Sequence, residues 1–181
     1  MGLFRYEENR ILRTVIHRII DVVVLISLAW FIVYAFCGQT IISGQSMSPV
    51  LSSGDMCLVN RLSYDLGKPD RYDIVLFERE NGQQNVKRII GLPGETVQIV
   101  SDSVYINNHK LDDPRLEGYI TLPGIAENPI VLQKDEYFLM GDNADSSEDS
   151  RFASIGNVKR SSIKGKLWFR LKPFNTIGKI E

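Results

Sequence analysis

The feature that most constrains this chain is a run of apolar residues near its N-terminus. From Ile19 to Cys37 the sequence reads IIDVVVLISLAWFIVYAFC, with Asp21 as its one charged residue. A helix of about 20 apolar residues spans the hydrocarbon core of a bilayer, which is roughly 30 Å thick. The run therefore predicts a transmembrane helix over residues 19–37. A cleaved secretory signal is the alternative, but the apolar stretch exceeds the usual core of about 7–15 residues and no small-x-small site clearly ends it.

Positive charge precedes this run and predicts its direction. The segment before it carries Arg5, Arg10, Arg13 and Arg18. Basic residues that flank a first membrane span tend to remain in the cytoplasm. We therefore expect a single-pass protein of the cell membrane, with a basic cytoplasmic N-terminus over residues 1–18 and an extracytoplasmic domain over residues 38–181.

The rest of the chain has the pattern of a β-rich domain. Short runs rich in Val, Ile and aromatic residues are separated by turn-forming clusters such as SSGD, GKPD, NGQ and LPGE. The runs are MCLVNRL, DIVLF, NVKRII, TVQIV, SVYI, EYFLM and KLWFRLK. Asn107 and Asn108 predict the tight turn of a hairpin, because Asn tolerates a positive φ. Residues 112–129 are the stretch most expected to form a long surface loop. The predicted fold class is mostly β, with one N-terminal transmembrane helix.

Composition argues against two classes of function. The formal net charge is -1, whereas a nucleic-acid-binding face needs an excess of Lys and Arg. Two Cys and two His, without CxxC or HExxH spacing, cannot assemble the three or four ligands that a zinc site needs. We therefore expect no nucleic acid, metal or cofactor as a partner. A disulfide between Cys37 and Cys57 has no support beyond their number, so two free thiols are expected.

The two histidines are poor candidates for a catalytic base. His17 lies on the cytoplasmic side of the predicted helix, and His109 follows the predicted hairpin turn. If the domain cleaves acyl bonds through a serine nucleophile, the base must then be a lysine, which works only as a neutral amine. Lys87 is the best placed, since it lies in the apolar run NVKRII and burial lowers the pKa of a lysine. The alternative is an ordinary edge-strand or snorkelling lysine.

Three sequence blocks carry a resemblance to a known family. They are SGQSMSPVL at residues 43–51, KRIIGLPGE at residues 87–95 and GDNADSSEDSR at residues 141–151. In this order, and after an N-terminal span, they resemble the signature boxes of bacterial type I signal peptidases, which remove leader peptides from exported proteins. The short chain and Gly44 are similar to Gram-positive forms. The resemblance implies a membrane-bound serine endopeptidase with a Ser/Lys dyad in a signal-peptidase-like, β-rich catalytic domain.

The resemblance implies a reacting role for two side chains. Ser46 matches the nucleophile. Lys87 matches the general base that takes the Ser46 proton, returns it to the leaving amine and then activates water. The backbone N–H of Ser46 matches an oxyanion donor. Some relatives place a hydroxyl two residues before the nucleophile as a second donor, but Gly44 stands there, so the second donor is unassigned.

Further residues match a supporting shell around the dyad. Ser147 matches the hydroxyl that orients the lysine amine. Asp142 matches the partner of Arg88, Asp149 matches the partner of Arg151, and both pairs are expected to brace the site. Without the resemblance, this block is a polar loop rich in turn-forming Asn and Asp.

By the same resemblance, the substrate is an exported pre-protein with small residues at the first and third positions before the scissile bond, such as Ala-x-Ala. An extended peptide is expected to add as a strand beside the segments of Lys87 and Ile42. A shallow apolar pocket would exclude large side chains, and the residues that match its lining are Ile42, Met47, Leu51, Val86 and Leu139. For Met47 and Leu139, a place in the plain core is the alternative. The expected partners are pre-proteins with signal peptides and the lipid bilayer.

Two positions depart from the usual third block and keep one alternative open. Ala144 stands where Arg is common and Ser146 where Asn is common, and both changes could loosen the bracing shell. A catalytically silent relative, acting as a chaperone or assembly factor for surface proteins, is therefore the second hypothesis. A bitopic structural protein is a third, and it leaves the three blocks unexplained. An S-x-x-K match at residues 161–164 lacks its partner motifs, and we attribute it to chance.

Overall fold

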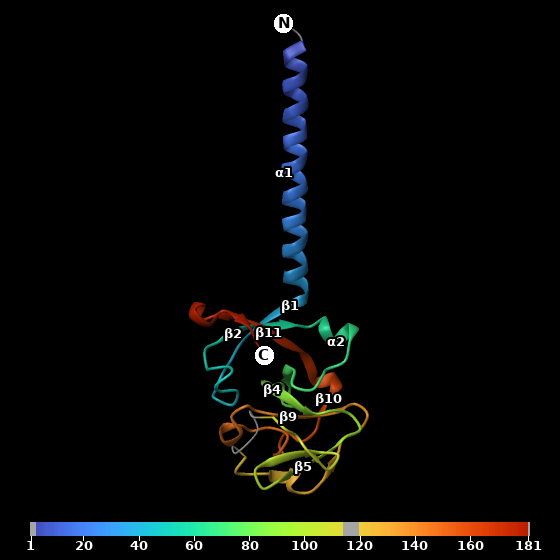
Figure 1. Ribbon diagram of the computed structural model, residues 1–181, viewed down its shortest axis with the longest axis vertical. Helices are drawn as coiled ribbons and strands as arrows, with labels where there is room; N and C mark the ends of the chain where they lie inside the picture. Colours follow the sequence, from blue (N-terminus) through green and yellow to red (C-terminus); the bar gives the residue numbers. More distant parts are fainter. Residues whose placement is uncertain (1–2, 114–119, 181) are drawn as a thin grey trace. The chain divides into compact units, whose positions relative to one another are not determined.

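A computed structural model describes residues 3–113 and 120–180, with side-chain environments for all of these except residues 3–9, 32–37 and 66 (Figure 1). The chain divides into two compact units, Met1–Cys37 and Gly38–Glu181. The first is one helix and the second is mostly β. The mostly-β fold class predicted for the larger unit is therefore confirmed.

The N-terminal unit contains helix α1, Leu3–Phe36. It begins well before the apolar run, because residues 3–36 contain no Gly or Pro to interrupt a helix. Within the residues that the structure describes, no helix is both long enough and apolar enough to qualify as a membrane span. The transmembrane helix predicted over residues 19–37, of which residues 32–37 have no described side chains, is thus not confirmed.

A sheet of eight described strands carries most of the larger unit. Its order is β1-β2-β11-β3-β4-β9-β10, with β12 paired to β11. The bounds are β1 Cys37–Ile41, β2 Met56–Asn60, β3 Ile74–Glu78, β4 Gln84–Gly91, β9 Glu136–Met140, β10 Val158–Lys159, β11 Ile163–Lys172 and β12 Gly178–Lys179. Strand β11 inserts between β2 and β3, so the segment before β2 and the strands that follow β3 meet in one sheet.

A second, smaller sheet lies in the order β7-β6-β5-β8. Its strands are β5 Thr96–Val100, β6 Ser103–Ile106, β7 His109–Lys110 and β8 Ile130–Val131. The predicted hairpin is confirmed, since Asn107 and Asn108 have φ values of 51° and 67° and Ile106 pairs with His109 across the turn. Residues 114–119 of the predicted surface loop lie outside the described residues. Short helical segments complete the unit: α2 Ser63–Leu66, η1 Gly124–Glu127, η2 Ala144–Ser146, η3 Arg160–Ser162 and η4 Phe174–Thr176.

Apolar side chains of the described residues form three core clusters. One packs residues of β4 and β9 against the smaller sheet. Another joins residues just before and within β2 to β3 and β11. The third lies on β3, β4 and β9 around Phe77 and Ile89. Strand β4 contributes to all three, since Val86 packs against the second cluster, Ile89 belongs to the third and Ile90 to the first. Cys57 is a free, buried thiol, and the side chain of Cys37 lies outside the described residues.

Candidate active site

Ser46 lies in an irregular segment between β1 and β2. The segment is closed at its base by Ile42 N–H donating to Asp55 O and Gly54 N–H donating to Ile42 O, both at 2.9 Å. Gly44 has a φ of 87°, a conformation that side chains disfavour. Met47, which follows Ser46, is 1% exposed and fixes the segment in the core, while Ser46 itself is half-buried. The backbone therefore turns sharply beside an anchored residue and leaves the serine hydroxyl accessible.

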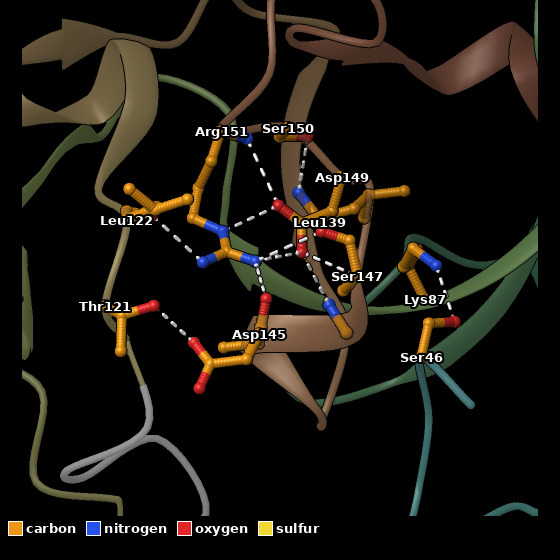
Figure 2. Close-up of polar contacts among 12 residues, drawn as sticks. Ser46, Lys87, Thr121, Leu122, Leu139, Asp145, Ser147, Asp149, Ser150 and Arg151 are labelled. Atoms are coloured by element: carbon orange, nitrogen blue, oxygen red, sulfur yellow. Dashed lines mark hydrogen bonds and ion pairs between the residues drawn. The ribbon is translucent and has the colours of Figure 1, made fainter.

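Lys87 comes from β4 and meets this hydroxyl. It lies opposite Val75 of β3 in the antiparallel register, and only 4% of the residue is exposed. Its Nζ atom lies 2.7 Å from Ser46 Oγ, at hydrogen-bond distance (Figure 2). The structure thus brings together the two residues that the sequence assigns to the reaction, although 41 positions separate them in the chain.

Burial changes the acid–base behaviour of Lys87. Removing an ammonium group from water disfavours its charged form, and this lowers the pKa of Lys87 to about 8. The negative charge of Asp149 opposes the effect of burial but does not overcome it. A substantial fraction of the amine is therefore neutral near pH 8, as a base requires.

The loop that follows β9 supplies a network centred on Asp149. Asp149 is fully buried. Its Oδ2 atom accepts hydrogen bonds from Ser147 Oγ at 2.7 Å and Gly141 N–H at 3.1 Å, while Oδ1 accepts from Arg151 Nε at 2.8 Å (Figure 2). Among the described residues, Ser147 has no hydrogen bond to Lys87, whose one side-chain hydrogen bond is to Ser46. The carboxylate therefore fixes the rotation of the Ser147 hydroxyl.

Arg151 ties this network to the rest of the loop. Its guanidinium donates to the carbonyls of Ala144 at 2.5 Å and Leu122 at 3.1 Å, in addition to Asp149. The methyl group of Ala144 packs in the core cluster around Ile90, and Ser146 is exposed. The two departures from the usual block thus leave the contacts around Asp149 complete.

A second buried ion pair involves Arg88, the residue that follows Lys87. Arg88 is 1% exposed. Its Nε and Nη2 atoms donate to the two carboxylate oxygens of Asp142, each at 2.7 Å, and Nη1 donates to Tyr72 O at 2.9 Å. This two-point contact joins β4 to the start of the Asp149 loop.

The apolar residues expected to line a substrate pocket fall into two groups. Ile42, Met47 and Val86 line a cavity of about 150 Å³ together with Ser46 and Lys87. Leu51 is fully buried in the same core cluster. Leu139 belongs instead to the cluster around Phe77 and Ile89. The structure therefore places Leu139 in the core and away from the lining of this cavity.

Several contacts at the site involve residues that sequence reasoning did not select. Asn143 N–H donates to Ser46 O at 3.0 Å and joins the nucleophile segment to the Asp149 loop. Gly141 lies where an added Cβ would be 2.3 Å from Ser147 Oγ. Arg79 donates to Glu148 at 2.8 Å. A single sequence does not predict a backbone contact such as that of Asn143. Gly141 could have been selected, because it is the first residue of the third block.

The described residues offer no evident alternative chemistry. No group of three or more His, Cys, Asp or Glu side chains in that part of the chain is arranged to hold a metal ion. His109 is exposed at the edge of the smaller sheet, and within the described contacts no histidine is hydrogen-bonded to Ser46. A neutral lysine beside a serine hydroxyl can accept the hydroxyl proton, as histidine does in many serine hydrolases.

Comparisons with known proteins agree with this class. The profile of the family described as "Signal peptidase, peptidase S26" matches residues 15–172. The chain is 39% identical over 145 residues to a signal peptidase I of Bacillus caldolyticus, covering 74% of this chain and 79% of that protein. It is 32% identical over 183 residues to signal peptidase IB of Staphylococcus aureus strain COL, covering 93% of each. A crystal structure of a signal peptidase I from Enterococcus faecalis V583 matches with a TM-score of 0.47 and 37% identity, covering 55% of this chain and 97% of that one.

The family profile and the two relatives compared by sequence identify the class and then the family. The chain is a serine endopeptidase, as its relatives of the S26 family are. It belongs to the signal peptidase family, whose reaction is the cleavage of signal peptides from exported pre-proteins. The resemblance to bacterial type I signal peptidases stated from the sequence blocks is therefore confirmed.

Proposed function

We propose that this protein cleaves signal peptides with Ser46 as nucleophile and Lys87 as general base. The observation that carries the proposal is the 2.7 Å separation of Lys87 Nζ and Ser46 Oγ within a buried setting. A serine hydroxyl needs a base within hydrogen-bond reach to become a nucleophile, and a lysine is a base only as the neutral amine. Burial supplies that neutral acceptor by lowering the pKa of Lys87 to about 8.

The proposed reaction proceeds through an ester intermediate. Neutral Lys87 takes the proton of Ser46 as Oγ attacks the scissile carbonyl, and the backbone N–H of Ser46 donates to the oxyanion that forms. The lysine ammonium then gives its proton to the leaving amine, which is the new N-terminus of the exported protein. Lys87, neutral again, activates a water molecule that hydrolyses the acyl-Ser46 ester. Each proton that the base accepts is returned in the following step.

The supporting roles assigned from the sequence form part of the same proposal. The structure has no hydrogen bond between Ser147 and Lys87, both of which it describes. The proposed role of Ser147 is to accept one from the Lys87 amine when that amine turns its lone pair toward Ser46. The hydroxyl proton of Ser147 is already engaged by Asp149, so its oxygen is left as an acceptor. The buried pairs Arg88–Asp142 and Arg151–Asp149 keep the loop and β4 in register.

The proposed substrate is the signal-peptide end of a pre-protein with small residues at the first and third positions before the cleaved bond. Ile42, Met47 and Val86 limit the size of the cavity that these residues would enter. In β4, residues 84–88 pair with β3 on one side, whereas the pairing with β9 begins only at Arg88. The first half of β4 therefore has an edge at which an extended peptide can add as a strand.

We further propose that the enzyme is attached to the cell membrane by α1, with a cytoplasmic N-terminus and an extracytoplasmic catalytic unit. Apolar side chains of α1 between Ile11 and Phe31 are exposed all round the helix, with Leu25 at 65% and Trp30 at 67%. Such a surface is stable only where lipid or protein covers it. Carbonate extraction of membranes and protease protection in inverted vesicles test attachment and direction, and recovery of the full chain in the extracted supernatant would rule the attachment out.

The decisive experiment for the reaction is cleavage of an Ala-x-Ala pre-protein in detergent. We expect Ser46→Ala and Lys87→Ala each to lower kcat/KM by at least about 10³-fold. Ser146→Ala and Lys134→Ala remove an exposed hydroxyl and an exposed amine and should leave the rate unchanged. Equal activity of the wild type and the two dyad variants would refute the mechanism, and inactivity of the wild type would favour the silent relative.

A further inference from the structure

Arg79 and Glu148 form an ion pair beside the dyad that the mechanism above does not use. Arg79 directly follows β3, and Glu148 stands between Ser147 and Asp149. Arg79 Nη2 lies 2.8 Å from Glu148 Oε2, and Ser154 Oγ donates to the other carboxylate oxygen at 2.8 Å. The side chain of Arg79 is only 16% exposed, whereas that of Glu148 is 52% exposed. The arginine is thus held by the protein, and it fixes a glutamate that would otherwise extend into solvent.

The position of the pair couples the two halves of the site. Strands β3 and β4 form an antiparallel hairpin in which Val75 lies opposite Lys87 and Glu78 lies opposite Gln84. Arg79 is therefore part of the hairpin that carries the base. Glu148 belongs to the loop that follows β9. It lies between Ser147 and Asp149, whose side chains are hydrogen-bonded to each other. The contact between Arg79 and Glu148 therefore ties the hairpin, beside its turn, to that loop.

The charges of the pair act on the same amine with opposite signs. The charged groups that influence Lys87 are Asp149, Glu148, Arg79 and Arg151. Arg79 disfavours the ammonium form and lowers the pKa of Lys87, whereas Glu148 favours that form and raises it. The effects of Arg79 and Glu148 on the pKa of Lys87 offset each other only while both side chains are charged and remain near the amine.

We propose that Arg79 and Glu148 are positioning residues for signal-peptide cleavage: their ion pair holds the Ser147 loop against the β3–β4 hairpin, and each residue offsets the charge of the other at the Lys87 amine. This inference rests on the proposed role of Lys87 as the base. Under this inference, Glu148 acts through its negative charge and its contact with Arg79. This role also explains why a solvent-facing glutamate is held at both oxygens.

The test is the pH dependence of kcat/KM in Arg79→Gln, Glu148→Gln and the double variant, measured on the full chain in detergent. Arg79→Gln leaves Glu148 unopposed, so the acidic limb should move to higher pH by about 0.2–0.7 unit. Glu148→Gln leaves Arg79 unopposed, so the limb should move to lower pH by a similar amount. In the double variant the limb should return close to that of the wild type, while kcat stays several-fold lower because the contact is lost.

A matched control lies one residue away. Glu78 pairs with Lys164 at 3.6 Å on the exposed surface, and Glu78→Gln should change neither the limb nor kcat. The inference would be overturned if the acidic limb of the pH profile did not move, or if it moved in the same direction in both single variants. Either result would leave the proposed roles of Ser46 and Lys87 unaffected. Retention of activity by Lys87→Ala would instead overturn the proposed function itself. A melting temperature for each variant verifies that the comparison is made on folded protein.

Discussion

Ser147 Oγ donates a hydrogen bond of 2.7 Å to Asp149 Oδ2, and this contact decides what the serine oxygen is free to do. Asp149 is fully buried and is itself held by Arg151, so the hydroxyl proton is directed away from Lys87. The oxygen lone pairs then remain available to accept from the amine. An amine that donates to Ser147 presents its own lone pair in a fixed direction.

Replacement of Ser147 tests this relationship. We expect Ser147→Ala to lower kcat by about 10²-fold with little change in KM, because the amine loses its orientation while the peptide-binding cavity is unaltered. Ser146→Ala, one residue earlier and exposed, is the control. Steady-state cleavage rates of a pre-protein check the prediction, which an unchanged kcat in Ser147→Ala would contradict.

The pH profile of the enzyme should report the titration of Lys87. Only the neutral amine accepts the Ser46 proton, so kcat/KM should rise with pH and reach half of its plateau near the pKa of about 8. The reaction should be slow where the ammonium form dominates, below that value. Initial rates from about pH 6 to 10 on a wild-type enzyme check this. A midpoint close to 10.5, the ordinary lysine value, would mean that the amine is hydrated.

The same burial should cost the protein stability at neutral pH. The pKa of Lys87 is about 8 in the folded chain and 10.5 in the unfolded one, so the unfolded chain binds more protons and the free energy of unfolding rises between these two values. Lys87→Met should therefore stabilise the protein at pH 7 by on the order of 3 kcal/mol. The gain should fade as the pH approaches 10.5. Denaturant unfolding at both pH values measures it, with exposed Lys134→Met as the control; a gain that is the same at both would argue against the assignment to the ammonium charge.

Gly141 should tolerate no side chain. A Cβ at this position would lie 2.3 Å from Ser147 Oγ and 2.4 Å from Ser46 O, so Gly141→Ala must displace the nucleophile segment, the loop or both. We expect most of the cleavage activity to be lost. Gly91→Ala is the comparison, because its Cβ would meet Val97 at 2.6 Å in the core. That variant should lose about 1–3 kcal/mol of stability but keep its rate per folded molecule. Equal activity of the two variants would show that the contact with Ser147 is unimportant.

Substrate selectivity should depend on Val86 and not on Leu139. Val86→Ala enlarges the cavity that contains Ser46 and Lys87. It should raise kcat/KM for a pre-protein with Val in place of Ala before the cleaved bond by about 10-fold relative to the Ala substrate. Leu139→Ala opens a hole in the core cluster around Phe77 and should cost about 2–5 kcal/mol without changing this ratio. Competition between the two pre-proteins measures the ratio directly, and a shift caused by Leu139→Ala would reverse the assignment.

The sequence predicted those parts of the molecule that depend on local pattern. Short runs rich in Val, Ile and aromatic residues predicted the mostly-β unit, and Asn107 and Asn108 predicted a turn that the structure contains. The three blocks selected Ser46 and Lys87, which lie 2.7 Å apart. The role of each remains a prediction that the experiments above address.

What the sequence did not predict depends on pairing over long distances. Leu139 and Val86 are both apolar, so the sequence does not distinguish them. The register of β4 with β3 and β9 places Val86 against the cluster of Met47, and Leu139 in the cluster of Phe77. The contact of Arg79 with Glu148 joins positions 69 residues apart through two exposed-looking polar segments. The insertion of β11 between β2 and β3 follows from no local signal.

Because of that insertion, the supports of Ser46 and Lys87 depend on a strand that comes late in the chain. Ser46 precedes β2 and Lys87 lies in β4, and in the sheet these two strands are connected through β11, Ile163–Lys172, and β3. A chain that has been synthesised only as far as β10 carries both groups but lacks the strand that bridges their supports. Residues far from both Ser46 and Lys87 in the sequence are thus needed to complete the sheet that supports them.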